Sequence, residues 1–157
     1  AGQGTAALEL FDQVVDLNGL IVPVGGGGLL AGCATVAYPG THVYGAEPEM
    51  ADDAVRSFNE GHLVREHIPQ TICDGLQTTL GEKNFEIIVE KVTDILLVSE
   101  QEIVDAMKLI WTRLKQVVEP SSAVTLAAVI RNKEVFAGQR LGLILTGGNV
   151  DLNDLPF

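Results

Sequence analysis

Four consecutive glycines at residues 25–28 follow an apolar segment at residues 19–24 and precede another at residues 29–37. Glycine has no Cβ, so several N–H groups in such a run can turn toward one point. A helix that begins directly afterwards adds its own free N–H groups and its positive end. The pattern predicts a strand, a loop and a helix that together bind an anion, most commonly phosphate. A tight turn without a ligand is the simpler alternative.

The rest of the chain alternates apolar segments of strand length with segments of helical periodicity. The expected strands are residues 19–24, 42–46, 94–98 and 141–145, and the expected helices are residues 6–15, 29–37, 52–59, 85–92 and 121–131. Strands separated by helices favour an α/β fold, with a mostly parallel sheet and helices on both faces. We expect one such region over residues 1–157, with ligands at the carboxyl ends of its strands.

Two helix starts are predicted from capping residues. Thr5 is the expected N-cap of the first helix. Ser99 and Glu102 have the spacing of a capping box, and apolar residues follow at helical spacing as far as Val118. Trp111 is expected in the hydrophobic core of the protein, together with the other apolar residues of this helix.

Charge and composition exclude several classes of partner. The net charge is −11, and the ten Lys and Arg residues are spread along the chain, so neither nucleic acid nor an anionic membrane is an expected partner. Cys33 and Cys73 lack the spacing of a zinc site and are expected to be reduced, buried thiols of a cytoplasmic protein. His42, His62 and His67 are expected on the surface.

Three phosphate-containing ligands can be compared for the glycine loop. A P-loop is excluded because no Gly-Lys-Ser/Thr follows the glycines. A dinucleotide site stays open, since Gly26, Gly28 and Ala31 satisfy G-x-G-x-x-A and Glu47 closes the next strand. That alternative leaves the glycine-rich segment at residues 146–149 unexplained. The third candidate is pyridoxal 5'-phosphate (PLP).

A set of short motifs, taken in order, supports PLP. They are Ala1-Gly2-Gln3-Gly4-Thr5, Val22-Pro23-Val24 with the glycine run, Ala46-Glu47-Pro48, Ala51-Asp52-Asp53, Asp74-Gly75, Glu119-Pro120 and Thr146-Gly147-Gly148-Asn149-Val150-Asp151. Together they resemble the second half of the serine racemases and threonine dehydratases, PLP enzymes of the tryptophan-synthase-β fold (fold type II). The resemblance covers essentially all of the chain and implies that fold.

The resemblance also implies roles for individual residues around the cofactor. The four glycines, Gly25, Gly26, Gly27 and Gly28, would hold the cofactor phosphate, and Gly75 and Glu119 would line the cofactor cleft. The Thr146 hydroxyl would face the pyridine nitrogen, where the family usually has Ser. A neutral hydroxyl does not favour a protonated pyridine, which suits proton removal and β-elimination. The alternatives are that Thr146 caps a strand end and that Glu119 favours a helix N-terminus.

A divalent metal site is implied at a second place. Glu47, Asp53 and the Ala51 carbonyl match the metal ligands of serine racemases, and oxygen ligands suit Mg²⁺ or Ca²⁺, with Mn²⁺ as a further option. Alternatively, Asp52 or Asp53 caps a helix and Glu47 is solvated.

A nucleotide effector site and a dimer are further implications of the same resemblance. Some serine racemases bind ATP between subunits, and Lys115, Asn149 and Asp151 fall at matching positions. The complete enzyme is therefore expected to be a homodimer that ATP can regulate.

No catalytic residue is expected within the chain itself. A PLP enzyme needs a Schiff-base lysine, and none of the lysines Lys83, Lys91, Lys108, Lys115 and Lys133 lies in a segment that resembles the family's lysine motif. We expect that lysine in an upstream part of a longer enzyme, and we expect the chain alone to be inactive.

The activity that the resemblance implies is serine racemisation, serine or threonine dehydration, or both. The α-proton of a small hydroxy amino acid would be removed, and reprotonation or β-elimination of the hydroxyl, with release of ammonia, would follow. The alternatives are an NAD-binding oxidoreductase domain and an inactive cofactor-binding fragment.

Overall fold

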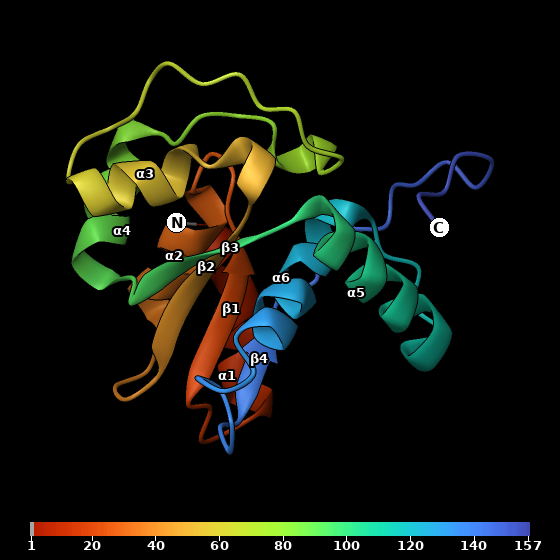
Figure 1. Cartoon of the computed structure of the whole chain (residues 1–157). Helices are drawn as coiled ribbons and strands as arrows, with labels where there is room; N and C mark the ends of the chain where they lie inside the picture. The colour runs from red at the N-terminus through yellow and green to blue at the C-terminus, as the bar shows by residue number, and fades with distance from the viewer. Residues whose placement is uncertain (1) are drawn as a thin grey trace.

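The computed structural model describes residues 2–157, so Ala1 of the first motif lies outside the described residues. Four parallel strands form one sheet in the order β3-β2-β1-β4 (Figure 1). Their bounds are β1 Gly19–Pro23, β2 His42–Pro48, β3 Asp94–Val98 and β4 Leu141–Leu143. The parallel α/β sheet is confirmed, and the predicted strand at residues 94–98 has the observed bounds of β3.

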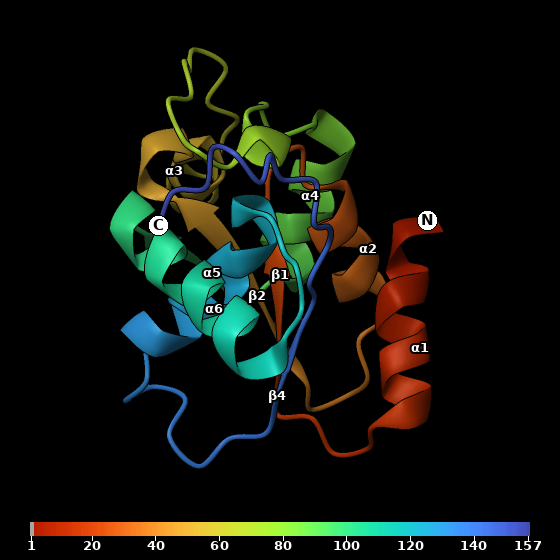
Figure 2. The ribbon, with the colours of Figure 1, turned by 90° about the vertical axis from the view of Figure 1, so that its right-hand side faces the viewer.

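Helices cover both faces of this sheet. They are α1 Thr5–Gln13, α2 Gly28–Val36, α3 Asp53–Glu60, α4 Glu82–Lys91, α5 Glu100–Leu114 and α6 Pro120–Arg131. Three short 3-10 helices join them: η1 Gly2–Gly4, η2 Glu49–Ala51 and η3 Asp74–Leu76. In the view of Figure 2, α1 and α2 lie on one side of β1, and α5 and α6 lie on the other.

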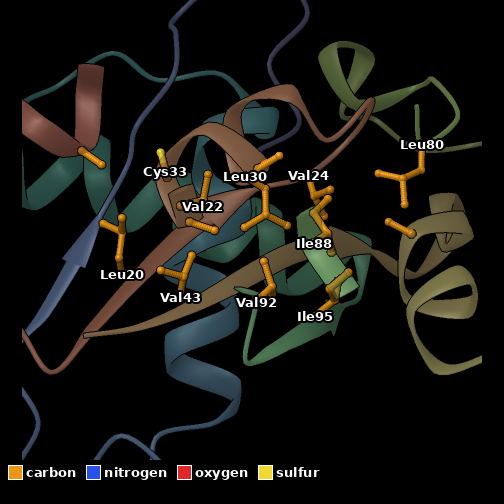
Figure 3. Packing of buried hydrophobic residues seen from close by; sticks show 14 of the residues in the cluster. Leu20, Val22, Val24, Leu30, Cys33, Val43, Leu80, Ile88, Val92 and Ile95 are labelled. Atoms are coloured by element: carbon orange, nitrogen blue, oxygen red, sulfur yellow. The ribbon is translucent and has the colours of Figure 1, made fainter. Parts of the chain in front are cut away.

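The central strand β1 separates two apolar cores. Leu20 and Val22 point into the core shared with α2 and α4, which Figure 3 shows around Leu30 and Ile88. The residue between them, Ile21, belongs to the other core, which α5 and α6 complete. Successive side chains of a strand point to opposite faces, so a strand covered on both faces must be apolar throughout. Every residue of β1 is accordingly buried.

The capping box is confirmed, whereas two details of helix ends were predicted wrongly. Ser99 Oγ accepts from the Glu102 N–H at 3.4 Å, and Glu102 Oε2 accepts from the Ser99 N–H at 2.8 Å. Thr5 is not the N-cap: Gly4 is, and the Thr5 hydroxyl donates to the Gly2 carbonyl. α5 ends at Leu114 and does not reach Val118, because the next residue adopts a left-handed conformation.

Trp111 is only partly in the core that was predicted for it. The indole is half-buried, and its Nε1–H donates a 2.8 Å hydrogen bond to the carbonyl of Val118. Its ring also meets Phe157 edge-to-face, with 5.6 Å between ring centroids. Trp111 therefore joins the end of α5 to the chain that leads into α6 and to the C-terminal segment.

Among the described residues, no helix combines the length and the apolar character that crossing a membrane requires.

Candidate cofactor-binding site

A cavity of about 290 Å³ lies at the carboxyl ends of β1 and β4. All seven residues predicted around the cofactor line it, namely Gly25, Gly26, Gly27, Gly28, Gly75, Glu119 and Thr146. Segments that are far apart in sequence therefore meet where ligands of parallel sheets usually bind. A cavity of similar size, about 300 Å³, lies among Phe11, Tyr38 and Thr41, and none of the predicted residues lines it.

The glycine loop exposes backbone donors to this cavity. The hydrogen bonds found within residues 2–157 include none donated by the N–H groups of residues 25–28. α2 begins at Gly28, so the positive end of its dipole and its first free N–H groups lie at the same point. Among residues 2–157 no basic side chain lines the cavity, whereas the hydroxyl residues Ser121 and Thr146 line it together with these backbone groups.

Hydrogen bonds from two neighbouring residues hold the loop in place. The carbonyl of Gly26 accepts hydrogen bonds from Asn84 Nδ2 at 2.6 Å and from the Gly81 N–H at 3.2 Å. Gly27 adopts φ +79°, and a Cβ there would lie 2.5 Å from Leu80 Cδ1. Only glycine fits this position without strain, because the backbone is left-handed and the space for a Cβ is occupied. The unliganded-turn alternative leaves the free N–H groups unexplained.

Thr146 and Glu119 approach the cavity from the β4 side. Thr146 follows the last strand, and its Oγ1 lies 3.2 Å from the Oγ of Ser122 in α6. Glu119 directly precedes α6 and makes no side-chain cap hydrogen bond to it, although it occupies the N-cap position. Its Oε2 instead accepts from the N–H of Asn149 at 2.8 Å. Glu119 thus lines the cavity and also fixes the loop that carries Thr146.

Ser122 is a residue that the sequence reasoning missed. It is fully buried, and its hydroxyl contacts both Thr146 and Gly147. The signal that could have indicated it is the Ser-Ser pair after Glu119-Pro120, since serine hydroxyls readily hydrogen-bond backbone groups.

Of the three residues predicted to bind a nucleotide effector, two line the same cavity and one does not. Asn149 and Asp151 line a cavity of about 300 Å³ together with Asp74 and Pro120. Lys115 does not line it, and its Nζ donates to the Thr112 carbonyl at 2.7 Å.

Glu47 is buried at the end of β2, so the alternative that its carboxylate is solvated is wrong. Its Oε1 accepts from the N–H of Ala54 at 3.0 Å and its Oε2 from the N–H of Val55 at 2.9 Å. Burial is the main cause that raises the pKa of Glu47 to about 8; the charge of Asp53 acts in the same direction, and the two hydrogen bonds act against it. Glu47 therefore caps the N-terminus of α3.

Asp53 begins α3 beside Glu47 and has one unsatisfied oxygen. Its Oδ2 accepts from the Leu80 N–H at 2.8 Å, whereas its buried Oδ1 has no hydrogen-bond partner within residues 2–157. Burial raises the pKa of Asp53, while that hydrogen bond and His67 lower it. Asp52 precedes it but makes no cap hydrogen bond, and its carboxylate pairs with Arg56 at 3.0 Å. The helix-cap alternative for these two aspartates is wrong.

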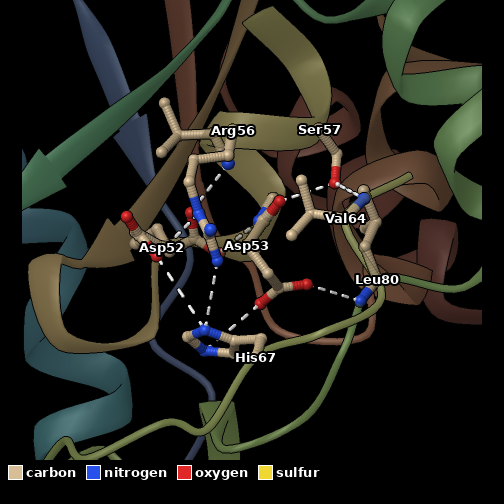
Figure 4. Close-up of polar contacts among 10 residues, drawn as sticks. Asp52, Asp53, Arg56, Ser57, Val64, His67 and Leu80 are labelled. Carbon is tan, nitrogen blue, oxygen red and sulfur yellow. Dashed lines mark hydrogen bonds and ion pairs between the residues drawn. The ribbon is translucent and has the colours of Figure 1, made fainter. Parts of the chain in front are cut away.

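The surface location expected for His67 is also wrong. Its side chain is only 7% exposed and lies between the two aspartates, with Nε2 at 3.8 Å from Asp53 Oδ1 (Figure 4). The segment after α3, which has no regular secondary structure, folds back over that helix and places the ring there. His42 and His62 are exposed, as expected.

The trio predicted for a metal contributes two carboxylates and one main-chain carbonyl. Glu47, Ala51 and Asp53 are each 1% exposed. Residues 2–157 contain no cluster of three or more His, Cys, Asp or Glu side chains arranged to hold a metal. The unpartnered Asp53 Oδ1 and the neighbouring carboxyl group of Glu47 are oxygen donors of the kind that a hard cation prefers.

Both cysteines are free and buried, in agreement with the prediction. Burial raises the pKa of Cys33 to about 11 and that of Cys73 to about 12. They are therefore inert apolar side chains at neutral pH.

Comparison with known proteins identifies the family. The sequence model of the pyridoxal-phosphate dependent enzymes matches residues 1–147. The chain belongs to this family. It is 50% identical to the β-hydroxyaspartate dehydratase of Paracoccus denitrificans over 160 aligned positions, which cover 100% of the chain and 51% of that protein. It is 49% identical to the serine racemase of Schizosaccharomyces pombe, with 97% of the chain and 48% of that protein covered.

Solved structures of this family share the fold. The crystal structure of serine racemase from Dictyostelium discoideum superposes with a TM-score of 0.90 at 47% identity, covering 96% of the chain and 50% of that structure. The predicted family and its fold type are thereby confirmed, and the dinucleotide-binding alternative is not supported. The chain spans about half the length of the curated relatives it matches.

Proposed function

We propose that the enzyme containing this chain is a PLP-dependent racemase or ammonia-lyase of small hydroxy amino acids. The observation that carries the proposal is a cavity lined both by the glycine loop, whose N–H groups are free, and by Thr146. Relatives named as a dehydratase of β-hydroxyaspartate and as a racemase of serine support this substrate class.

The four glycines would hold the cofactor phosphate through backbone N–H groups at the start of α2. Thr146, at the other wall of the cavity, would be the partner of the ring nitrogen. When bound, the cofactor supplies an electron sink for the α-carbon of the amino acid. A hydroxyl partner keeps that sink weaker than a carboxylate partner would, which favours racemisation and β-elimination over transamination.

Glu119 and Gly75 line the cavity together with the glycine loop and Thr146. The N–H of Gly75 donates a 3.1 Å hydrogen bond to Ser121 Oγ. A Cβ on Gly75 would lie 3.1 Å from the same hydroxyl oxygen and would crowd it. Glu119 holds the Thr146 loop against α6 through Asn149. A cofactor ring bound in the cavity would lie against the walls that these contacts hold in place.

The lysine that binds the cofactor belongs to another part of the enzyme. None of the lysines in the described part of the chain lines the cavity. The lysine supplied by the other part of the enzyme would remove the α-proton. The same proposal includes Mg²⁺, Ca²⁺ or Mn²⁺ at Glu47, Ala51 and Asp53. It also includes an ATP effector near Lys115, Asn149 and Asp151, in a homodimer.

The proposal is tested on the complete enzyme. Purified protein should carry PLP absorbance, and borohydride treatment should attach the cofactor to a lysine outside residues 1–157, identified by peptide mass spectrometry. L-serine, L-threonine and 3-hydroxyaspartate are then compared for 2-oxo acid release and for formation of the opposite enantiomer. NAD binding without PLP absorbance would refute the proposal.

A further inference from the structure

The Oγ of Ser122 makes four polar contacts with the loop after β4. It accepts from the N–H of Thr146 at 2.9 Å and from the N–H of Gly147 at 2.7 Å. It also lies 2.8 Å from the Gly147 carbonyl and 3.2 Å from Thr146 Oγ1. Ser122 is fully buried and does not line the cavity, so it reaches a cofactor only through Thr146.

Counting protons excludes Thr146 as the donor in the contact between the two hydroxyls. A serine hydroxyl has one proton to donate and two lone pairs that accept. The N–H groups of Thr146 and Gly147 occupy both lone pairs of Ser122. The Ser122 proton goes to the Gly147 carbonyl or to Thr146 Oγ1, and neither choice leaves a lone pair for the Thr146 proton.

The hydroxyl proton of Thr146 is therefore free to point into the cavity. Within residues 2–157, Thr146 Oγ1 makes no side-chain hydrogen-bonding contact other than the one to Ser122. Thr146 lines the cavity. A ring nitrogen placed there meets a hydroxyl that has a proton to give, and such a nitrogen must be an unprotonated acceptor.

We propose that Ser122 is a positioning residue that fixes the Thr146 hydroxyl as a hydrogen-bond donor to the cofactor ring nitrogen. The proposal rests on the proposed function, because it requires PLP in this cavity. Ser122 holds the backbone of Thr146 and Gly147, and because its two lone pairs are filled it does not accept the Thr146 proton.

The test is a double-mutant cycle on the complete enzyme, with the dissociation constant of PLP for the apoenzyme as readout. Ser122→Ala and Thr146→Val should each weaken PLP binding by about tenfold, the loss expected for one hydrogen bond. The double variant should bind PLP as weakly as Thr146→Val alone, because the contribution of Ser122 passes through Thr146. The pH dependence of the absorption of bound PLP should change in Ser122→Ala and in Thr146→Val alike.

The matched control is Thr125→Val. Thr125 is equally buried in α6, but its hydroxyl donates to the Ser122 carbonyl within the helix. It should retain the PLP affinity and spectrum of the wild type. Circular dichroism melts of the apoenzymes separate loss of folding from loss of affinity.

Each outcome supports or overturns the proposal. Additive losses of affinity in the double variant, or unchanged affinity in a folded Ser122→Ala apoenzyme, would overturn it. If Ser122→Ala does not fold, Thr146→Val alone decides, since PLP affinity equal to that of the wild type would also overturn it. Failure of the wild type to bind PLP would instead sink the proposed function, which keeps the two failures distinguishable.

Discussion

Glu119 Oε2 accepts a 2.8 Å hydrogen bond from the backbone N–H of Asn149. This contact joins the start of α6 to the far end of the loop that begins at Thr146. The chain between them is confined, because a Cβ on Gly147 would lie 3.0 Å from Glu119 Oε2 and a Cβ on Gly148 would overlap the Val117 carbonyl. The position of the Thr146 hydroxyl therefore depends on two glycines that do not themselves line the cavity.

Gly148→Ala should displace this loop. The Cβ meets a backbone carbonyl, which cannot rotate away, so the free energy of unfolding should fall by about 1–3 kcal/mol and PLP affinity should fall with it. Urea unfolding of the complete apoenzyme and PLP titration measure the two effects. Gly2→Ala is the control, since nothing lies within 4 Å of its Cβ. Equal behaviour of the two variants would contradict the prediction.

Gly27→Ala should be more severe. A left-handed backbone is unfavourable for alanine by about 1 kcal/mol or more, and the new Cβ would lie 2.5 Å from Leu80 Cδ1 and 3.0 Å from Ile88 Cδ1. Together these effects should lower the free energy of unfolding by roughly 2–4 kcal/mol. Gly28→Ala, whose Cβ meets only Asn84 Nδ2 at 3.9 Å, should melt like the wild type. A Gly27→Ala melt that matches that of Gly28→Ala would count against this account of the loop.

The buried thiols give a prediction that depends on pH. Burial raises the pKa of Cys33 from 9.0 to about 11 and that of Cys73 from 9.0 to about 12. At about pH 8, iodoacetamide should not label either residue in the native enzyme, because the thiolate is the nucleophile. Peptide mass spectrometry should find both residues labelled after unfolding in guanidinium. Labelling of native Cys73 at the rate of the unfolded chain would contradict the prediction.

The same shifts fix the sign of a stability change at high pH. Between pH 9.0 and about 11 the unfolded chain has released thiol protons that the folded chain still holds. Stability is therefore fully present below pH 9 and falls as the pH rises through this window. Cys73→Ala should reduce the steepness of that fall, as measured by melting temperature against pH.

The sequence predicted those parts of the fold that local patterns determine. β3 and the glycine loop follow from short apolar runs and turn chemistry, and the Ser99–Glu102 capping box is a contact within one helical turn. The burial of His67 could not be predicted, because it depends on an irregular segment that folds back over α3. Ser122 was missed for a similar reason, since its partners lie more than twenty residues further along the chain.

The last prediction concerns a metal ion at Glu47 and Asp53. Two acidic side chains that are each 1% exposed lie close enough for the charge of one to raise the pKa of the other. Glu47 gains hydrogen bonds from the start of α3, but Asp53 Oδ1 has no such partner within residues 2–157. A hard cation would relieve the repulsion and would satisfy the free oxygen, so the folded state should bind it.

Mg²⁺ or Ca²⁺ should therefore raise the melting temperature of the complete enzyme above its value in EDTA. A cation at a hundred times its dissociation constant would stabilise the fold by about 2.7 kcal/mol. Asp53→Asn and Glu47→Gln should abolish this response. Asp52→Asn should keep it, because that carboxylate is partly exposed and pairs with Arg56. If the wild type melts at one temperature in both buffers, the two carboxylates serve only the packing of α3 and the metal site is absent.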